Sequence, residues 1–378
     1  MAWTAQSPTA GQRKPRSRDG KMRIGVFWPY SRTLIPSAEI ARRNPDVLNL
    51  DNHISFVQAI ETVGMDFALI ADGYAPASEA NSRVGFQDPS TNAIILAVPL
   101  ILATSHLGII STVHTTFIHP VVIARLGAHL DWISGGRWGW NIVNGFREHE
   151  ARLFGVEGQL DHDGGYELAQ EAVDIIKGIW SNSPEGVDHQ GKRFKVKGKI
   201  RRPVPPTLPL LVSAAASEMG RAFAAANCDY LFTSSQTPES ILELAADLKE
   251  AASAAEKSEP PQILVLSDIL IRDNPGEAFQ LHQELMGSTD PEAQAAWVSH
   301  LSKIGTRRVK PGELLTFLGT PAEVADQIIE LHRASRLTGL CLRMPLWSAE
   351  EAMRLDGVFA CLEKANIWSR PETRNFGW

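Results

Sequence analysis

Eight short apolar segments recur along the chain, and each is followed by at least one longer segment in which apolar residues have helical spacing. The short segments are rich in Ile, Val, Leu and Phe and are mostly bounded by Gly, Pro, Asp or Asn, which is typical of strands buried on both faces. Strands that alternate with helices in this way predict an α/β fold, the (β/α)8 TIM barrel. The predicted strands are residues 23–28, 66–71, 107–113, 138–143, 208–213, 229–233, 262–271 and 338–343.

The predicted helices lie between these strands. In the first of them the apolar residues recur at helical spacing, and Asp51 stands where a capping residue is expected. The predicted helices are residues 52–63, 91–103, 120–133, 166–180, 218–226, 238–255, 275–285, 322–334 and 349–365.

Two regions interrupt the alternation. Residues 181–209 are polar and rich in Gly, Pro and Lys, and we interpret them as an excursion from the barrel, with a hairpin as one form of it. Residues 286–315 contain a weakly helical piece at 293–301 and a basic run at 303–310. A solvated patch is favoured over a phosphate clamp for the basic run. Because long insertions in compact domains are usually functional lids or disordered segments, a lid is one hypothesis for 286–315.

The length of 378 residues fits either two domains or one barrel with insertions. We predict a single barrel domain over residues 22–368, with insertions near 181–209 and 286–315. Residues 1–21 carry five basic residues against one acid and no apolar run, so a disordered basic tail is expected there. Residues 369–378 are expected to form a C-terminal tail.

The composition excludes several classes of protein. The formal charge is −6, from 37 Lys and Arg and 43 Asp and Glu, which gives no electrostatic reason to bind nucleic acid or an acidic membrane. Cys228, Cys341 and Cys361 lie far apart, which argues against a disulfide framework or a structural zinc site. No apolar stretch approaches the roughly 20 residues of a membrane span. Without a secretory signal, the expected location is the cytoplasm.

The chemistry of such a barrel belongs at the carboxyl ends of its strands. Asn141 lies in the fourth predicted strand between Trp140 and Ile142, although Asn is disfavoured in strands and a buried amide needs a partner. Strand alternation places Asn141 and Gly139 on the interior face, where the missing side chain of Gly139 leaves room for a ligand. A hydrogen bond from Asn141 to a neighbouring barrel side chain explains the pattern equally well.

The third predicted strand ends in polar residues. Thr112 and His114 share one face of it, and His is the usual acid or base at neutral pH. His119, by contrast, is interpreted as a structural residue. After the fifth strand, the small residues 213–217 leave amide groups at a helix N-terminus, where anions can bind. An ordinary N-cap at Ser217 explains that segment equally well.

Several catalytic templates are absent from the sequence. It contains no GxSxG elbow, no GxxxxGK[ST] phosphate loop, no HExxH, and no GxGxxG after the first strand. Asp161, His162 and Asp163 resemble a metal cluster, but adjacent residues of a regular element point in different directions. Capping of the following helix is therefore favoured, and no metal is expected.

Residues 131–145 resemble the signature of the bacterial-luciferase-like flavin-dependent monooxygenases. The resemblance covers nearly all of residues 22–368, and the chain is most similar to the branch that holds pyrimidine, dimethylsulfone and alkanesulfonate monooxygenases. It implies a two-component enzyme to which a separate flavin reductase supplies reduced FMN (FMNH2). Such enzymes activate O2 as a flavin (hydro)peroxide to oxygenate or cleave a small organic substrate, here a heterocyclic or a sulfur- or nitrogen-containing one. The resemblance further implies a homodimer or homotetramer.

The resemblance also implies the site. Thr112 and Asn141 would line the pocket where O2 meets the flavin ring, and His114 is a candidate proton donor or base. Tyr166 and Ser217 would lie toward the FMN phosphate. The family's flavin contacts fall on Asp72, Gly73, Asn141, Glu150, His162, Tyr166 and Ser217.

Two departures from the family pattern concern the phosphate and the substrate. Gly164 and Gly165 replace the Glu-Arg that often precedes the tyrosine at 166, so backbone amides or another base, with Arg221 as candidate, would hold the phosphate. Residues 144–146 replace the commoner Thr-Gly or Ser-Gly, and the Arg-Pro loop of the alkanesulfonate enzymes is missing. A sulfonate substrate is therefore disfavoured.

Two other functions stay open at this point. One is an F420-dependent oxidoreductase on the same barrel, against which the pairing of Thr112 with Asn141 argues. The other is a flavin-binding protein without catalysis. Trp28, Tyr30 and Trp347 lie at or beyond strand ends, and packing is favoured over a substrate-lining role for each of them.

Overall fold

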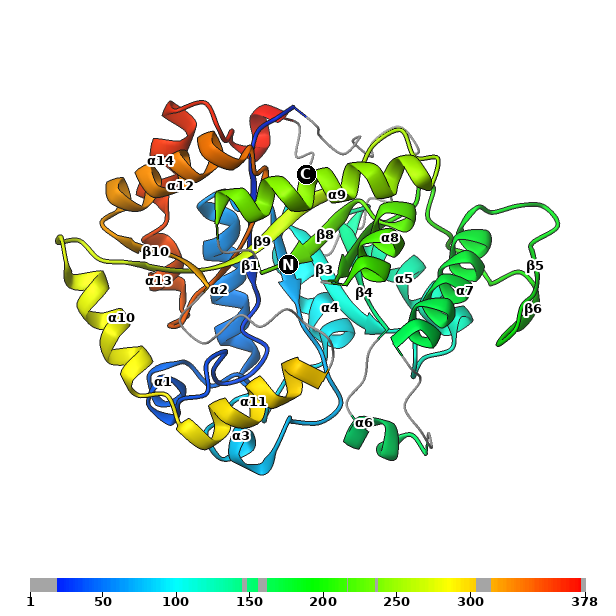
Figure 1. The fold of residues 1–378 in the computed structure, drawn as a ribbon, viewed down its shortest axis with the longest axis horizontal. Coiled ribbons are helices and arrows are strands. Elements are labelled where there is room, and N and C mark those ends of the chain that lie inside the picture. The colour runs from blue at the N-terminus through cyan, green and yellow to red at the C-terminus, as the bar shows by residue number, and fades with distance from the viewer. Residues whose placement is uncertain are drawn as a thin grey trace.

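The computed structural model describes residues 19–144, 148–155, 162–215, 217–234, 237–303 and 314–374. Eight parallel strands close into a ring, because β8 pairs with β9 and β11 pairs with β1 (Figure 1). These are the eight strands expected from the sequence, so the predicted TIM barrel is confirmed. In ring order they are β1 (Arg23–Phe27), β2 (Phe67–Ile70), β3 (Gly108–His114), β4 (Trp138–Val143), β7 (Leu210–Ala214), β8 (Tyr230–Thr233), β9 (Gln262–Ile271) and β11 (Gly339–Arg343).

In the part of the chain that the structure describes, three further strands lie outside the ring. β5 (Val187–Gln190) and β6 (Lys195–Gly198) form an antiparallel hairpin within the polar region 181–209. β10 (Leu315–Gly319) pairs with the last residues of β9, which extend beyond the barrel. The sequence analysis did not predict β10, and the strand is half-exposed at an edge rather than buried on both faces.

The helices occur where helical spacing predicts them, with a few differences. Asn49, not Asp51, caps the first long helix, because the Asn49 side chain accepts a hydrogen bond from the Asp51 backbone N–H at 3.0 Å. The expected helix at 349–365 is broken into two. The helices are α1 (Ala38–Arg43), α2 (Leu50–Thr62), α3 (Glu79–Arg83), α4 (Ala93–Ala103), α5 (Pro120–Ser134), α6 (Glu148–Leu153), α7 (His162–Trp180), α8 (Glu218–Asn227), α9 (Pro238–Ala254), α10 (Glu277–Gly287), α11 (Pro291–Lys303), α12 (Pro321–Ser335), α13 (Ala349–Met353), α14 (Asp356–Lys364) and the 3-10 helix η1 (Pro371–Arg374).

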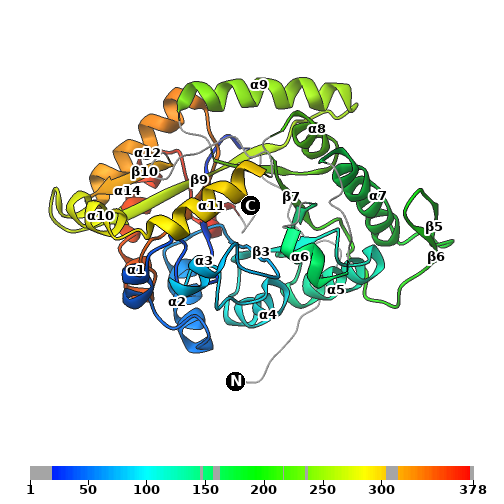
Figure 2. The same cartoon turned by 60° about the horizontal axis from the view of Figure 1, so that its bottom comes forward.

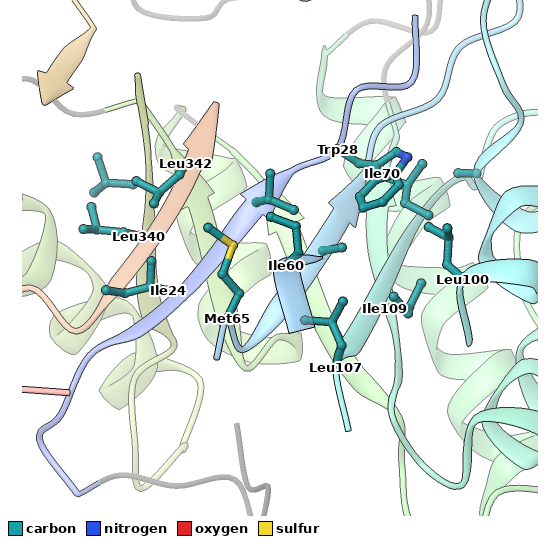
Figure 3. Close-up of a cluster of buried hydrophobic side chains, with 14 of the residues drawn as sticks. Ile24, Trp28, Ile60, Met65, Ile70, Leu100, Leu107, Ile109, Leu340 and Leu342 are labelled. Carbon is teal, nitrogen blue, oxygen red and sulfur yellow. The ribbon is translucent and has the colours of Figure 1, made fainter. Parts of the chain in front are cut away.

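Two apolar clusters hold the barrel and its helices together. The larger one fills the space between the strands and the surrounding helices, where Ile60 and Leu100 pack near strand residues such as Ile109 (Figure 3). The smaller one fills the inside of the barrel and includes Ile110 and Leu210. Each such side chain contributes about 1.5–3 kcal/mol on full burial. The two clusters show which strand residues point outward and which point inward.

Polar side chains close the amino-terminal end of the barrel. Arg137 directly precedes β4 and donates once from Nε, twice from Nη1 and twice from Nη2. A guanidinium has five N–H groups, so all of them are used. Burial lowers the pKa of Arg137 to about 10, and the charge of Glu61 opposes that shift. The acceptors are the backbone oxygens of Ile101, Thr104, Leu107 and Ser134 and the Thr104 hydroxyl.

Glu61 occupies the same end of the barrel, near the last turn of α2. Its carboxylate accepts hydrogen bonds from the backbone N–H groups of Ser105, His106 and Leu107. Burial acts to raise the pKa of Glu61, but these hydrogen bonds outweigh it and the pKa is lowered. The carboxylate therefore fixes the turn that leads into β3.

The other end of the barrel carries four helices from the connections that leave the carboxyl ends of the strands. α1, α3, α6 and α11 lie together at the lower end of the molecule in Figure 1. In Figure 2, where that end comes forward, α3, α6 and α11 lie in front of the barrel strands. This end is referred to below as the mouth, and it is where barrel enzymes place their sites.

Candidate active site in the mouth of the barrel

Thr112 and Asn141 meet inside the barrel at the carboxyl ends of β3 and β4. They are directly opposite each other in the parallel register of the two strands, and Asn141 Nδ2 donates to Thr112 Oγ1 at 2.9 Å. Their inward direction follows from Gly139, where a side chain would meet Ile110 and Leu210 of the interior cluster. The predicted face of each strand is therefore confirmed.

The Asn141 amide is only partly satisfied by this contact. The residue is 4% exposed, and its Oδ1 has no hydrogen-bond partner among the described residues. An unpartnered buried acceptor costs about 1–3 kcal/mol. Asn141 therefore makes the predicted bond to a barrel neighbour and still presents an acceptor that a ligand donor can use.

His114 lies two residues beyond Thr112 on the same face of β3. It is 6% exposed, and its Nε2 lies 3.3 Å from the backbone oxygen of Asp72. The ring of Tyr74 packs against it with 5.6 Å between ring centroids. His114 is thus buried beside Thr112 and Asn141, as the strand alternation predicts.

Asp72 and Gly73 follow β2, where the resemblance places flavin contacts. The Asp72 carboxylate accepts hydrogen bonds from the backbone N–H groups of Gly73 and Ala93 and from Asn92 Nδ2. Burial raises the pKa of Asp72, and these backbone bonds oppose the shift. The carboxylate therefore ties the loop after β2 to the first turn of α4, and its neighbouring backbone remains at the mouth.

Glu150 is held in α6 and is 2% exposed. Its Oε1 accepts from the backbone N–H of Tyr74 at 2.8 Å and of Ala75 at 3.3 Å. The carboxylate therefore fastens α6 to the loop after β2. A direct contact with the flavin remains a prediction.

An aromatic cluster that the sequence analysis missed surrounds this contact. Phe117 and Phe154 stack with 4.2 Å between centroids, and Tyr74 meets both rings edge-on at 5.4 and 4.8 Å. Burial, followed by the charges of Asp72 and Glu150, raises the pKa of Tyr74 to about 12. The Tyr74 hydroxyl therefore stays protonated and can donate at neutral pH. Each ring comes from a different loop, so no local sequence pattern predicts that the three rings pack together.

Tyr166, Ser217 and Asn144 form a polar group at the N-terminus of α8. Burial raises the pKa of Tyr166, while hydrogen bonds with Ser217 and Asn144 oppose that shift. Ser217 also caps α8, because its side chain accepts from the backbone N–H of Gly220 at 3.1 Å. Both interpretations of Ser217 are thus compatible: it is an N-cap, and it lies beside the tyrosine assigned to the phosphate.

The remaining predicted phosphate ligands are placed less directly. His162 begins α7, but its side chain lies outside the described residues. Arg221 pairs with Asp247 of α9, with 3.4 Å between Nε and Oδ2. A side chain at Gly165 would meet Asn144 at an ordinary distance of 3.5 Å, so this position faces the polar group and has room for a side chain.

Trp28 and Trp347 are packing residues, as favoured from the sequence. Both are buried in the outer cluster, where the ring of His53 stacks between them at 5.8 and 5.3 Å. Tyr30 is only partly buried and contacts Phe27 edge-on. Of the three aromatic residues, Tyr30 is therefore the one that is not fully buried.

Part of the region predicted as a lid is described. α11 packs on α3, where Asn81 Nδ2 donates to the backbone oxygen of Ala293 at 3.0 Å and Phe86 meets Trp297 at 5.3 Å. Most of the basic run, residues 304–313, lies outside the described residues. Movement of this region as a lid stays a prediction.

The described side chains contain no group of three or more His, Cys, Asp or Glu residues that could hold a metal ion. Among the described helices, none combines the length and the apolar character that crossing a membrane requires.

Known proteins share this fold and sequence pattern. Residues 22–337 match the family described as luciferase-like monooxygenase, so the chain belongs to that family. The chain is 27% identical over 298 residues to nitrilotriacetate monooxygenase component A of Aminobacter aminovorans, which covers 70% of this chain and 63% of the relative. It is 27% identical over 308 residues to the dimethyl-sulfide monooxygenase of Hyphomicrobium sulfonivorans, covering 74% and 63%. A pyrimidine monooxygenase of Enterobacter sp. (strain 638) is 27% identical over 290 residues, covering 76% and 77%.

Two of these alignments span 63% of the relatives' own length. Among solved structures, long-chain alkane monooxygenase superposes with a TM-score of 0.83 at 21% identity, covering 94% of this chain and 96% of that chain. An F420-dependent secondary alcohol dehydrogenase superposes with a TM-score of 0.68 at 17% identity, covering 90% and 99%. At such identities the superpositions establish the barrel fold alone.

Proposed function

We propose that the chain is the oxygenase component of a two-component flavin-dependent monooxygenase that uses FMNH2 and O2 on a small organic substrate. The single observation that supports this most is the pair formed by Thr112 and Asn141, with Asn141 Oδ1 buried and unpartnered among the described residues. An enzyme that binds and orients a cofactor in a dry site needs such a preorganised polar group. The family membership supports the same function.

The residues present fit FMN. Asn141 Oδ1 suits an N–H group of the flavin ring, and Thr112 lies beside it. Tyr166, Ser217 and Asn144 carry hydroxyl and amide groups at the N-terminus of α8, which suits a phosphate. Both groups stand at the same end of the barrel, because they follow the carboxyl ends of neighbouring strands.

Bound FMNH2 supplies the electron pair of the reaction, in which one atom of O2 enters the substrate and the other leaves as water. Thr112 and Asn141 orient the reacting groups by hydrogen bonds, and their burial excludes water. His114 lies next on the same face and would hold or move a proton through its imidazole. Glu150 and Asp72 position the loop after β2 that forms this wall of the mouth.

FMNH2 would come from a separate reductase. One relative is named nitrilotriacetate monooxygenase component A, and a component is one part of a larger system. A homodimer or homotetramer, and residence in the cytoplasm, complete the proposal.

The test supplies FMNH2 under air, from any flavin reductase, with a panel of heterocycles, sulfones and amines. Coupled formation of an oxygenated product supports the proposed function. Binding of FMN without turnover supports a flavin carrier, and preference for reduced F420 supports a deazaflavin oxidoreductase; either result overturns the proposal. The product and H2O2 are measured together, because uncoupled oxidation of FMNH2 yields H2O2 alone.

A further inference from the structure

A second wall of the mouth lies on β8, β9, β11 and β1, which are neighbours in the ring. Cys341 and Leu264 belong to the interior cluster, so Arg343 and Asp268, at even spacings along the same strands, also point inward. Arg343 and Asp268 are directly opposite each other in the register of β11 and β9. A buried ion pair therefore lines the inside of the mouth.

This ion pair is a two-point contact. Arg343 Nε lies 2.6 Å from Asp268 Oδ1, and Nη2 lies 2.9 Å from Oδ2. Nη1 donates to the backbone oxygen of Leu34 at 3.2 Å. These contacts use three of the five N–H groups of a guanidinium, so two have no acceptor among the described residues. The Arg343 side chain is 19% exposed and that of Asp268 is 5% exposed, so the pair is mostly buried but still partly open at Arg343.

Aromatic and aliphatic side chains flank the pair. Phe27 of β1 and Phe232 of β8 pack against the interior cluster and stack with 5.9 Å between centroids and 5° between ring planes. Tyr30 meets Phe27 edge-on at 6.3 Å. Phe27, Phe232 and Leu266 point inward and yet remain only half-buried. The inner surface of this wall is therefore apolar, flat in part, and open to solvent.

The charges on this wall cancel. Asp268 neutralises Arg343, so an anionic ligand would place a second carboxylate beside that of Asp268 against one guanidinium. A neutral oxygen acceptor brings no charge and can take the unused N–H groups. A flat molecule would also cover the half-exposed rings.

We propose that this wall binds the substrate, and that the substrate is a neutral, planar molecule whose carbonyl or sulfonyl oxygen accepts from Arg343. Asp268 acts as a positioning residue that fixes the guanidinium, and Phe27 and Phe232 contact the flat body. The inference rests on the proposed function, to which it adds a substrate class and a specificity-determining residue.

The test measures binding of three probes that share one ring system: 9-fluorenone, fluorene and fluorene-9-carboxylate. Equilibrium dialysis is carried out on the full chain, both flavin-free and with saturating FMN. The wild type is expected to bind fluorenone about tenfold more tightly than fluorene, as one hydrogen bond to a charged donor provides, and to bind the carboxylate most weakly. Equal affinity for the three, preference for the carboxylate, or no binding of fluorenone overturns the proposal.

The variant Arg343→Met/Asp268→Asn removes the pair as a unit and leaves no unpaired charge. It is expected to abolish the tenfold preference for fluorenone over fluorene and to keep the affinity for fluorene. The matched control is Arg272→Met/Glu351→Gln, which removes another ion pair located beyond the barrel, with 2.9 Å between Nη1 and Oε2 and side chains that are 16% and 17% exposed. The control should keep the preference. A preference that survives in the Arg343 variant overturns the proposal.

Arg343→Lys provides a second variant in case the double variant does not fold. It keeps the positive charge but loses the planar fork of N–H donors. It should reduce the preference while leaving the affinity for fluorene unchanged; a fully kept preference contradicts a role for the fork. Failure of the two proposals is distinguishable. If the protein binds fluorenone selectively but turns over no substrate with FMNH2, only the proposed function is overturned. If the protein carries out coupled turnover but binds fluorenone no more tightly than fluorene, only the present inference is overturned.

Discussion

Two arginines stand at opposite ends of the barrel, and their hydrogen bonding differs. Arg137, at the amino-terminal end, uses all five N–H groups on oxygens of the surrounding turns. Arg343, in the mouth, uses three. Asn141 is likewise left incomplete, with Oδ1 unpartnered among the described residues. Both ends bury polar side chains, so burial alone does not separate structure from function.

For Arg137, Asn141 and Arg343, the number of donors and acceptors that the fold satisfies does separate them. A polar group whose partners all lie within the fold stabilises that fold, and its removal leaves those partners unsatisfied. A group that the fold leaves partly unsatisfied can instead take water or a ligand as its partner. The residues around Arg137 are thus expected to govern stability, and those around Asn141 and Arg343 to govern chemistry and binding.

The sharpest test of the mouth is Asn141→Ala. We expect product formation to fall about a hundredfold, because one preorganised polar group in a dry site typically contributes that much. FMNH2 oxidation should continue and yield H2O2. The measurement is the ratio of product to H2O2 per FMNH2 consumed. Unfolding in urea should change little, because the loss of the hydrogen bond to Thr112 is offset by the removal of the unsatisfied Oδ1. Full coupling in this variant would remove Asn141 from the mechanism.

The matching test at the closed end is Arg137→Met. We expect the free energy of unfolding to fall by about 4 kcal/mol, because five acceptors lose their donor in a buried site. The comparison variant is Arg343→Met/Asp268→Asn, which should change that free energy by less than about 2 kcal/mol. Urea denaturation measures both. Equal losses in the two variants would mean that Arg343 is as structural as Arg137.

The sequence predicts the barrel well because its strands carry their own signal. Buried parallel strands are continuous apolar runs, and all eight were recognised in this way. β10 was not predicted, because it is half-exposed at an edge of the sheet and does not form a continuous apolar run. The helices α1, α3 and α6 were not predicted, because each has too few residues for the helical spacing of apolar residues to be recognised.

The sequence predicts which way the site residues point, but it does not predict which residues they contact. Alternation along a strand places Thr112 and Asn141 inside the barrel, whatever their neighbours are. Their 2.9 Å contact depends on the register between β3 and β4, which no local pattern encodes. Asp268 and Arg343 show the same limit, because they are 75 residues apart and meet only through the pairing of β9 with β11. Tyr74 and Phe154 meet only because Glu150 joins α6 to the loop after β2.

Gly165→Arg sharpens the comparison by adding donors to the mouth. This position lies in α7 and faces Asn144, and a side chain fits there. We expect the affinity for FMN to rise about fivefold, because an added guanidinium can contact the phosphate, and the affinity for riboflavin, which lacks the phosphate, to stay unchanged. Fluorescence titration with both flavins measures the difference. A parallel gain for riboflavin would place the new side chain elsewhere.

His53 tests whether the role of a residue is decided by how fully its hydrogen bonds are satisfied or by where it lies in the barrel. It lies near the carboxyl end of β1, yet both ring nitrogens are satisfied, by Trp28 Nε1 at 3.2 Å and by the Val47 backbone oxygen at 2.7 Å. Burial lowers the pKa of His53 from its ordinary value of 6.5, so the folded chain holds it neutral. Its contribution to stability is therefore complete above pH 6.5 and is lost as the pH falls through the lowered pKa. We expect His53→Gln to lose less stability than the wild type between pH 7.5 and pH 5, by about 1 kcal/mol in urea denaturation. FMN affinity at pH 7.5 should not change; a loss of FMN binding in this variant would show that a position near the strand ends matters even for a residue whose hydrogen bonds are complete.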